Sequence, residues 1–434
     1  MELDILDSLV AHQLNNSLLA LVDCNNFFVS CERVFNPSLK NKPVAVLSNN
    51  DGCIIARSNE VKDLKIPMGA LVFKYQDIIN VYNVKLFSAN FALYGDLSWR
   101  VMECLKSFTN KIEIYSIDEA FLNLERLEEP EKYGETMARQ VLQWTGVPVT
   151  IGIAKTKTLT KVASEYAKKN YLKSFCLVDQ EKINQILKDF PIEDIWGVGR
   201  KWSQKLKDFG IFTGLDLKNT NQKFIRQKFN VLLGKTYLEL NNISCIELEE
   251  SLKQKKSLVV SRSFGKKVSS YNELLEAISS YTERAAIKLR QDNLKAESLT
   301  IYIRTNHFSK IDQQYRNSKT IKLDYATNDT AILIGEAAKL LQKIFRPNFC
   351  YAKAGVLLTG LIKEQYNQYN LFFKPTAQDN SKLLLALDKI NRNYGRNTLL
   401  FASSGLKNKK NWLMKSTKKS RNYTRNWQEL LTVK

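Results

Sequence analysis

Short apolar runs alternate with amphipathic stretches through the first part of the chain. Residues 18–24 form an apolar run that ends in a carboxylate, which is typical of a buried strand. The same pattern predicts further strands at 43–47, 111–115, 119–124 and 149–154, and helices at 27–35, 91–108, 131–145 and 156–169. Because helices alternate with strands around an adjacent strand pair, we expect a βαββαβ core with an insertion between about residues 37 and 84.

The alternation returns in residues 257–361, after a mostly helical segment at 175–245 and a lysine-rich linker at 251–256. In the strand at 298–304, apolar side chains alternate with polar ones in the order Leu299, Thr300, Ile301, Tyr302, Ile303 and Arg304. This alternation directs the apolar set toward covering helices and the polar set toward an open sheet face. A solvated face and an aromatic, basic face laid against a nucleic-acid backbone both fit this pattern.

Composition and charge narrow the class of protein. The 434 residues leave room for about three domains. With 44% hydrophobic and 25% charged residues, the chain is globular rather than disordered, collagenous or a coiled coil. Its 65 Lys and Arg against 44 Asp and Glu give a net charge of +21, which favours a polyanion as partner, nucleic acid before an acidic membrane surface. A basic protein without such a partner remains the alternative.

Histidine and cysteine usage excludes several chemistries. With only His12 and His307, a His-rich zinc site cannot be built, and neither residue lies in a recognisable nucleophile signature. The seven cysteines are scattered and never form a Cys-x-x-Cys pair, which is typical of reduced thiols in a cytosolic protein. No apolar run approaches 18 residues and no signal peptide precedes the first strand, so we expect a soluble, cytoplasmic protein without membrane contact.

Three acidic residues stand where apolar strands are predicted: Asp23, Asp118 and Glu119. Burying a carboxylate costs several kcal/mol unless it is paired or bound to metal. In a βαββαβ sheet the first strand lies beside the central hairpin, so the three can converge, provided that Asp118 and Glu119 lie at the hairpin turn or on a bulge. Such a trio suits Mg²⁺ or Mn²⁺, two of which, about 4 Å apart, would support phosphoryl transfer. Acids that face water at a hairpin turn are the other interpretation.

Three segments carry the pattern of a known family: LVDCNNFFVSCE at 21–32, PVAVLSNNDGCIIAR at 43–57 and YSIDEAF at 115–121. They resemble the Y-family DNA polymerases, most of all the UmuC-like members, and the similarity runs from about residue 18 to the C-terminus. The resemblance implies an error-prone translesion DNA polymerase of the SOS response with an α+β right-hand fold. It implies an N-terminal extension (1–16), palm (17–36 and 85–172), fingers (37–84), thumb (173–245), linker (246–256), little finger (257–361) and a basic C-terminal segment (362–434).

The resemblance also implies roles at the active site. Two Mg²⁺ ions, for which Mn²⁺ can substitute, would be held by Asp23, Asp118, Glu119 and the Cys24 backbone carbonyl, with Asp118 and Glu119 as catalytic residues. Phe28 stands at the steric gate, where its ring would clash with a ribose 2′-hydroxyl; a core role suits the neighbouring Phe27 better.

Cations are expected around the nucleotide's triphosphate. Lys168 matches the family's palm lysine, and Arg57 and Lys62 are the basic candidates of the fingers. The sequence departs from the family at Asn59, where many members have a phosphate-contacting tyrosine, and at Lys62, where arginine is common. Lysine neutralises a phosphate but cannot make the bidentate contact of arginine.

Several residues are candidates for sequence-independent DNA contacts, which should weaken steeply with salt. Residues 196–206 indicate a helix-hairpin-helix, in which Gly197 and Gly199 would offer backbone N–H groups to a phosphate beside Arg200 and Lys201. A simple turn is the alternative there. Further candidates are Arg262 and Lys266 on a strand that resembles the family's DNA-gripping strand, and Tyr302 and Arg304 on the open sheet face.

The C-terminal segment suggests protein partners. Gln368, Leu371 and Phe372 lie in a pentapeptide that resembles the peptide by which bacterial polymerases bind the sliding clamp. The last 33 residues carry nine Lys and Arg and one Glu, a net charge of +8, with Trp412, Tyr423 and Trp427 among them. A solvated tail is the default for such a run, but the aromatics favour docking onto DNA or a partner. The resemblance implies a UmuD-like dimer and RecA as partners, beside primer-template DNA and deoxynucleoside triphosphates.

Two other functions remain open. One is a non-catalytic DNA-binding protein with the same fold that regulates the SOS response. The intact acidic trio argues against this function, because a regulator would not need it. The other is a two-metal phosphotransferase such as a nucleotide cyclase, in which a thumb, a little finger and a clamp peptide would have no purpose.

Overall fold

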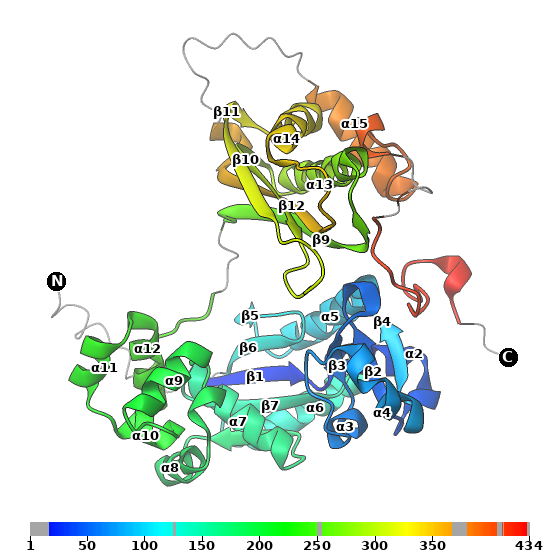
Figure 1. Ribbon diagram of the computed structural model, residues 1–434. Coiled ribbons are helices and arrows are strands. Elements are labelled where there is room, and N and C mark those ends of the chain that lie inside the picture. Colours follow the sequence, from blue (N-terminus) through cyan, green and yellow to red (C-terminus); the bar gives the residue numbers. More distant parts are fainter. Residues whose placement is uncertain are drawn as a thin grey trace. The chain divides into compact units, whose positions relative to one another are not determined.

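The computed structural model describes residues 17–124, 127–249, 254–366, 380–405, 410 and 412–431. The chain divides into two compact units (Figure 1). The first contains Met1–Leu47, Cys53–Leu252 and Lys418–Lys434, and the second contains Ser48–Gly52 and Lys253–Thr417. Each unit has its own mixed α/β core.

A five-stranded sheet organises the first unit, in the order β5-β6-β1-β7-β8. Its strands are β1 (Leu18–Cys24), β5 (Ile112–Ile114), β6 (Glu119–Leu124), β7 (Val149–Ala154) and β8 (Ser174–Leu177). The helices that connect them are α5 (Phe91–Lys106), α6 (Pro130–Thr145) and α7 (Lys157–Lys169). β1 lies in the middle, antiparallel to both β6 and β7, so the predicted βαββαβ core is present.

The two faces of this sheet have different neighbours. Ala20, Val22 and Cys24 of β1, with Ala120 and Leu122 of β6, face a core formed with α5 and α6. Strand alternation sends the odd-numbered residues of β1 and β6 to the other face. That face carries the acidic residues and is the one over which α7 lies, because lysines of α7 reach both Asp23 and Glu119.

The insertion predicted at 37–84 forms most of a small sheet with short helices, and the third strand of that sheet lies just past residue 84. Strands β2 (Val44–Leu47), β3 (Ile54–Arg57) and β4 (Lys85–Ser88) pair in the order β3-β2-β4. Two helices, α3 (Asn59–Asp63) and α4 (Gln76–Val81), flank them, and α2 (Phe27–Phe35) joins β1 to this part.

The rest of the first unit is helical: α8 (Gln180–Lys188), α9 (Arg200–Asp208), α10 (Gly214–Asn219), α11 (Gln222–Lys228) and α12 (Val231–Leu240). Its core is continuous with that of α7, because Leu159 and Val162 of α7 pack in the same buried cluster as Leu206 and Leu233.

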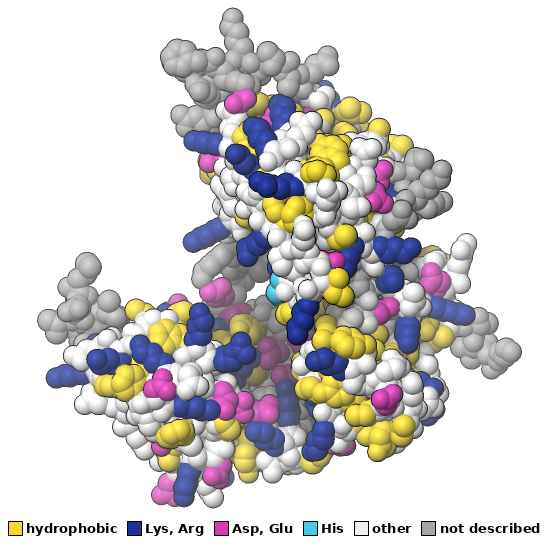
Figure 2. Space-filling model, in the orientation of Figure 1, with side chains coloured by type: hydrophobic (Ala, Val, Ile, Leu, Met, Phe, Trp, Pro, Cys, Tyr) yellow, Lys and Arg dark blue, Asp and Glu magenta, His cyan; other side chains and the backbone are white. Residues whose placement is uncertain are grey.

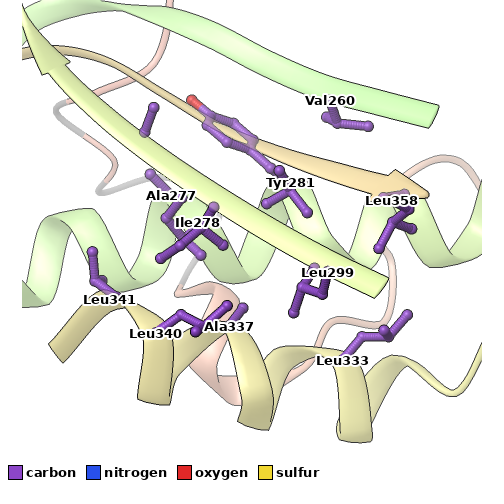
Figure 3. Packing of buried hydrophobic residues seen from close by; sticks show 14 of the residues in the cluster. Val260, Ala277, Ile278, Tyr281, Leu299, Leu333, Ala337, Leu340, Leu341 and Leu358 are labelled. Atoms are coloured by element: carbon purple, nitrogen blue, oxygen red, sulfur yellow. The ribbon is translucent and has the colours of Figure 1, made fainter. Parts of the chain in front are cut away.

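The second unit is a four-stranded antiparallel sheet under two helices. Its strands are β9 (Ser257–Val268), β10 (Leu294–Thr305), β11 (Arg316–Thr327) and β12 (Tyr351–Lys363), in the order β11-β10-β12-β9. Helices α13 (Tyr271–Gln291) and α14 (Thr330–Ile344) pack on one face (Figure 3), and α15 (Ser381–Asn393) follows. Unlike the first sheet, this one has its first strand, β9, at the edge and its last, β12, inside.

The predicted alternation of β10 is confirmed. Leu299, Ile301 and Ile303 are fully buried toward α13 and α14, whereas Tyr302 and Arg304 are half-buried on the opposite face. Figure 3 shows Leu299 and Leu358 of the sheet meeting Ile278 of α13 and Leu333 of α14 in this core.

The basic C-terminal segment differs from a solvated tail. Trp412 is only 3% exposed and meets the Tyr281 ring edge-on in the core of the second unit. Tyr423 stacks on Phe35 in the first unit, whereas Trp427 is 90% exposed. Two of the three aromatics thus dock within the chain itself, because apolar rings find buried partners there.

Two further expectations concern cysteines and membranes. All seven cysteines lie within the described residues, and none of them is paired in a disulfide. Within the described ranges, none of the helices has the length and apolar character that crossing a membrane requires.

Candidate active site

The acidic trio gathers at neighbouring strand ends. Asp23, next to last in β1, stands opposite Glu119, the first residue of β6, in the antiparallel register. The Cys24 backbone N–H donates to the Asp118 carbonyl at 2.9 Å. Residues 95 positions apart in the sequence therefore reach one edge of the sheet, where their side chains are only half-buried.

Asp118 and Glu119 avoid strict alternation because Asp118 lies in the turn before β6. The backbone N–H groups of Tyr115 and Ser116 both donate to the Glu119 carbonyl at 3.1 Å, which closes this turn. The Ser116 hydroxyl donates to Asp118 Oδ1 at 2.6 Å and accepts from the Asp118 N–H at 3.2 Å. The turn, not a bulge, frees Asp118 from the alternation.

Two lysines of α7 pair with two of the three acids. Lys168 Nζ lies 2.5 Å from Asp23 Oδ2, and Lys161 Nζ lies 2.6 Å from Glu119 Oε1. Burial raises the pKa of Asp23 to about 6 from 3.8; Lys168 acts in the opposite direction, and the charges of Glu119 and Asp118 raise the pKa further. Desolvation and like charges thus outweigh the lysine. Because the charges of Glu119 and Asp118 both affect the pKa of Asp23, the three acids lie within electrostatic range of one another.

The fit of these residues to a metal rests on their chemistry. Among the described residues, no three His, Cys, Asp or Glu side chains are grouped closely enough to hold a metal ion. Each acid instead has a lysine or serine partner. The donors are nevertheless hard oxygens of the kind that Mg²⁺ prefers. Burial is the main cause of the raised pKa of Asp23, and the negative charges of Glu119 and Asp118, which a divalent cation would offset, add to it. The Cys24 side chain is buried toward α5 and α6, so only its backbone could contribute.

Phe27 and Phe28 occupy different environments. Phe27 is 3% exposed in the core, whereas Phe28 is half-buried. The Phe28 ring stacks on Tyr94, with centroids 4.6 Å apart and planes 16° from parallel, and meets Phe91 edge-on at 5.9 Å. Asn26, with φ of 48°, makes the sharp turn from β1 into α2. Because of this turn, Phe28 lies just past the end of β1 at which Asp23 stands.

The basic candidates of the insertion lie near Lys168. The Arg57 guanidinium donates to the Ile66 carbonyl, and its Nε atom is buried without a partner in the structure as described. Burial lowers the pKa of Lys62, the charges of Arg57 and Lys168 lower it further, and Asp23 has the opposite effect. Asn59 instead accepts a hydrogen bond from Asn26. Lys62 is therefore within electrostatic range of two other cations, Arg57 and Lys168, and of two acids, Glu165 and Asp23.

Lys161 is a member of this site that the sequence analysis did not single out. It reaches Glu119 and lies 4.8 Å from the centre of the Tyr115 ring. The sequence could have indicated this residue, because Lys161 stands seven residues before Lys168 and therefore lies two turns away on the same face of the helix.

The glycine hairpin leads into α9. Gly197 has φ of +89°, and a Cβ atom there would lie 2.8 Å from Thr236 Oγ1, so both conformation and space require glycine. Gly199 is the N-cap of α9, and Arg200 and Lys201 follow it on the exposed surface. The first turn of α9 thus combines open backbone N–H groups with two cations.

The candidates of the second unit lie around the middle of its sheet. Arg262 and Tyr302 flank β12, where Arg262 pairs with Ala354 and Tyr302 with Gly355. A Cβ at Gly355 would lie 2.5 Å from the Tyr302 ring, so the ring lies close over this glycine. Burial lowers the pKa of Lys353, and the charges of Arg304 and Arg262 lower it further. Arg304 pairs with Lys353 on the open face beside Tyr302, whereas the register puts Arg262 opposite Ala354, on the face that the helices cover. Lys266 is exposed on β9.

The pentapeptide with Gln368, Leu371 and Phe372 lies outside the described residues.

Comparison with known proteins gives four family-model matches. The impB/mucB/samB family matches residues 22–165, and the C-terminal domain of that family matches residues 255–371. The family's HHH motif matches residues 181–211, and a domain of unknown function matches residues 381–433.

Two similar proteins align with nearly the whole chain, and a third aligns with about three quarters of it. Protein UmuC of Salmonella typhimurium is 41% identical over 424 residues, which span 96% of this chain and 100% of that protein. Protein ImpB of Salmonella typhimurium is 39% identical over 95% of this chain and 99% of its own length. DNA polymerase IV of Francisella tularensis subsp. novicida is 27% identical over 74% of this chain and 94% of its own.

Among solved structures, a chimera of the Y-family DNA polymerases Dbh and Dpo4 superposes with a TM-score of 0.64. It is 21% identical, and the alignment covers 80% of this chain and 99% of the chimera. At this identity the likeness concerns the fold.

Proposed function

The chain belongs to the impB/mucB/samB family of Y-family DNA polymerases, and from this premise we propose that it carries out error-prone translesion synthesis during the SOS response. It is a DNA-directed DNA polymerase with the α+β right-hand fold of that family. The residue roles, metal, domain bounds and partners that follow are our proposals. The convergence of Asp23, Asp118 and Glu119 at one sheet edge is the observation that carries them.

We assign the metal site to the acidic trio and the Cys24 backbone carbonyl, with two Mg²⁺ ions as the natural occupants. Bound there, the ions supply Lewis-acid stabilisation of the attacking and leaving oxygens in nucleotidyl transfer. Lys168 and Lys161 would release the carboxylates of Asp23 and Glu119 and become free to face the phosphates of the nucleotide. The positions of both lysines, within 2.6 Å of those carboxylates, support this exchange.

The incoming nucleotide is held by cations and screened by an aromatic ring. Lys168, Arg57 and Lys62 bind the triphosphate, as their mutual electrostatic influence supports. Phe28 bars a ribose 2′-hydroxyl. Its ring stacks on Tyr94 and is only half-buried, so that part of it remains exposed for this role.

DNA is held through its backbone by both units. We assign residues 17–36 and 85–172 to the palm, 37–84 to the fingers, 173–245 to the thumb and 257–361 to the little finger. Phosphate contacts come from the hairpin at Gly197 and Gly199 with Arg200 and Lys201, and from Arg262, Lys266, Tyr302 and Arg304. The exposed first turn of α9 and the cations around β12 support these contacts.

Protein partners complete the proposal. Gln368, Leu371 and Phe372 would dock into the sliding clamp, and a UmuD-like dimer and RecA would act with the polymerase. The 41% identity to Protein UmuC over nearly the full length of both chains supports this group of partners.

Primer extension by the purified protein tests the function. With primer-template, deoxynucleotides and Mg²⁺, the wild type should extend the primer. Asp118→Ala and Glu119→Ala should each lower the rate by roughly a thousandfold, the equivalent of several kcal/mol of metal-derived stabilisation. Glu135→Ala, which removes an exposed acid of α6, is the matched control and should keep full activity.

Other outcomes point elsewhere. DNA binding without extension, alone and with a UmuD-like partner, would favour the non-catalytic regulator. Extension that survives Asp118→Ala or Glu119→Ala would refute the metal assignment while leaving the polymerase activity standing.

A further inference from the structure

A buried acid lies behind the ring that we assign as the steric gate. Glu32 of α2 is 2% exposed, and burial raises its pKa. The hydroxyl of Tyr94, a residue with 0% exposure on α5, donates to Glu32 Oε1 at 2.7 Å. The Ser420 hydroxyl donates to the same oxygen at 3.0 Å. Since a buried acid is costly without donors, this carboxyl depends on a residue 388 positions away in the sequence.

Ser420 belongs to a segment that docks on the first unit, residues 418–423, which we call the C-terminal strap. At its start the Ser88 N–H donates to the Lys418 carbonyl at 3.0 Å, and the Lys418 N–H donates to Ser88 Oγ at 2.9 Å. At its end Tyr423 stacks on Phe35 at 4.8 Å with planes 9° apart. Both ends of the strap are therefore fixed.

The middle of the strap is held by a fully buried amide. Asn90 is 0% exposed, and its Nδ2 group lies within hydrogen-bond distance of the Ser420 carbonyl at 3.3 Å, Ser420 Oγ at 3.0 Å and the Arg421 carbonyl at 3.2 Å. Ser420 Oγ thus accepts from Asn90 and donates to Glu32. Because Asn90 immediately precedes α5, the strap is connected to the same helix that carries Tyr94.

Tyr94 connects this network to Phe28. One face of the tyrosine ring stacks on Phe28 at 4.6 Å, and its hydroxyl is fixed by Glu32. A ring held by stacking alone can slide in its plane, whereas a ring that also has a fixed hydroxyl cannot. The place of Phe28 therefore depends on the chain Ser420–Glu32–Tyr94.

We propose that the C-terminal strap sets sugar selection: Ser420, through Glu32 and Tyr94, is a positioning residue for the Phe28 gate. The inference rests on the proposed function and extends it to a segment that matches a domain of unknown function. A clash excludes a hydroxyl only if the ring that makes it cannot yield, and a shift of less than 1 Å is enough to weaken such exclusion. The strap supplies this rigidity without touching the nucleotide.

The test compares nucleotide selection in full-length variants. For the wild type, Ser420→Ala, Ser420→Thr and Tyr94→Phe, kcat/KM is measured for a deoxynucleotide and for the matching ribonucleotide opposite one template base. Ser420→Ala and Tyr94→Phe should lower the preference for the deoxynucleotide by about fivefold, the effect of one ordinary hydrogen bond. Ser420→Thr keeps the hydroxyl and should therefore keep the wild-type preference for the deoxynucleotide. Ser416→Ala, at an exposed serine just before the strap, should change nothing.

A double-variant cycle separates positioning from general stability. Once Phe28→Ala has removed the gate, adding Ser420→Ala should not lower the preference further, because nothing remains to be positioned. A strap that only stabilises the fold would lower both efficiencies equally, and an unchanged preference in both Ser420→Ala and Tyr94→Phe would overturn the proposal. Failure of the wild type to extend any primer would instead refute the proposed function.

Discussion

At the scale of single residues, two neighbouring phenylalanines show how local geometry divides similar side chains between the buried core and its half-exposed margin. The left-handed Asn26 starts α2 directly after β1, so that consecutive residues point to different surroundings. Phe27 enters the core at 3% exposure, whereas Phe28 stays at its margin, stacked on Tyr94. Adjacent and chemically identical, the two residues serve as controls for each other.

Replacing each phenylalanine should separate selectivity from stability. We expect Phe28→Ala to lower the preference for deoxynucleotides about tenfold or more, because the clash with the 2′-hydroxyl is lost. Phe27→Ala should instead cost about 3–5 kcal/mol of unfolding free energy through the cavity that it leaves, with selectivity unchanged in the folded fraction. Parallel urea denaturation and single-nucleotide incorporation check both; a selectivity loss in Phe27→Ala alone would reverse the assignment.

Glu32 predicts a pH dependence of stability with a definite sign. Burial raises its pKa above the ordinary 4.5, so the native state keeps this proton to a higher pH than the unfolded chain does. The stability that the proton contributes is present below about pH 4.5 and is lost as the pH rises through the native pKa. Glu32→Gln cannot ionise. Its unfolding free energy relative to wild type should therefore increase between pH 4.5 and 7.5, which urea titrations can measure; a constant difference would contradict this.

At the scale of elements, one buried carboxylate joins the last helix of the first unit's helical part to the sheet-covering helix α7. Glu239 of α12 has 0% exposure and accepts from the Thr158 N–H at 2.8 Å and the Thr158 hydroxyl at 2.9 Å. It also accepts from the Ile246 N–H at 3.0 Å. Thr158 lies in the first turn of α7, where the helix dipole favours an anion.

Removing this carboxylate should loosen α12 from α7. We expect Glu239→Ala to lower the unfolding free energy by about 3 kcal/mol, because several buried donors lose their acceptor together. Glu135→Ala on exposed α6 is the control and should lie within about 0.5 kcal/mol of wild type. Thermal or urea unfolding of both variants gives the comparison, and equal stabilities would contradict the role of Glu239.

The elements themselves were largely predictable, but their long-range partners were not. The strand at 149–154 and the helix at 27–35 have the observed bounds, because periodicity is a local property of the chain. The order of strands in the second sheet, with β12 inside and β9 at the edge, depends on packing and has no local signal. The same holds for the site: the motif predicted that Asp23 would meet Glu119, whereas no spacing relates Ser420 to Glu32.

At the scale of the whole molecule, the net charge of +21 favours association with a polyanion such as DNA. Lysine and arginine side chains are distributed over the visible surface of both units rather than confined to one of them (Figure 2). Both the exposed start of α9 and the cations around β12 contribute to this surface. Binding should therefore be strong at low salt and insensitive to base sequence.

Salt titrations of DNA binding can measure how much the hairpin before α9 contributes to phosphate contacts. The double variant Arg200→Ala/Lys201→Ala removes two exposed cations, so the slope of log K against log salt should become shallower by about 2. The loss should be the same for unrelated sequences of equal length. Lys132→Ala/Arg139→Ala removes the same charge from exposed positions of α6 and should leave the slope unchanged. Equal slopes for both double variants would remove the hairpin from the DNA interface.

The strap at 418–423 has a consequence for biosynthesis. Glu32 and Asn90 leave the ribosome hundreds of residues before Ser420 does, so the nascent first unit lacks the hydrogen bonds of the strap to these two buried polar groups until residues 418–423 have emerged. A product terminated early, even one that contains every motif of the reaction, would lack these bonds. Translation through the strap thereby becomes a condition for a fully ordered first unit.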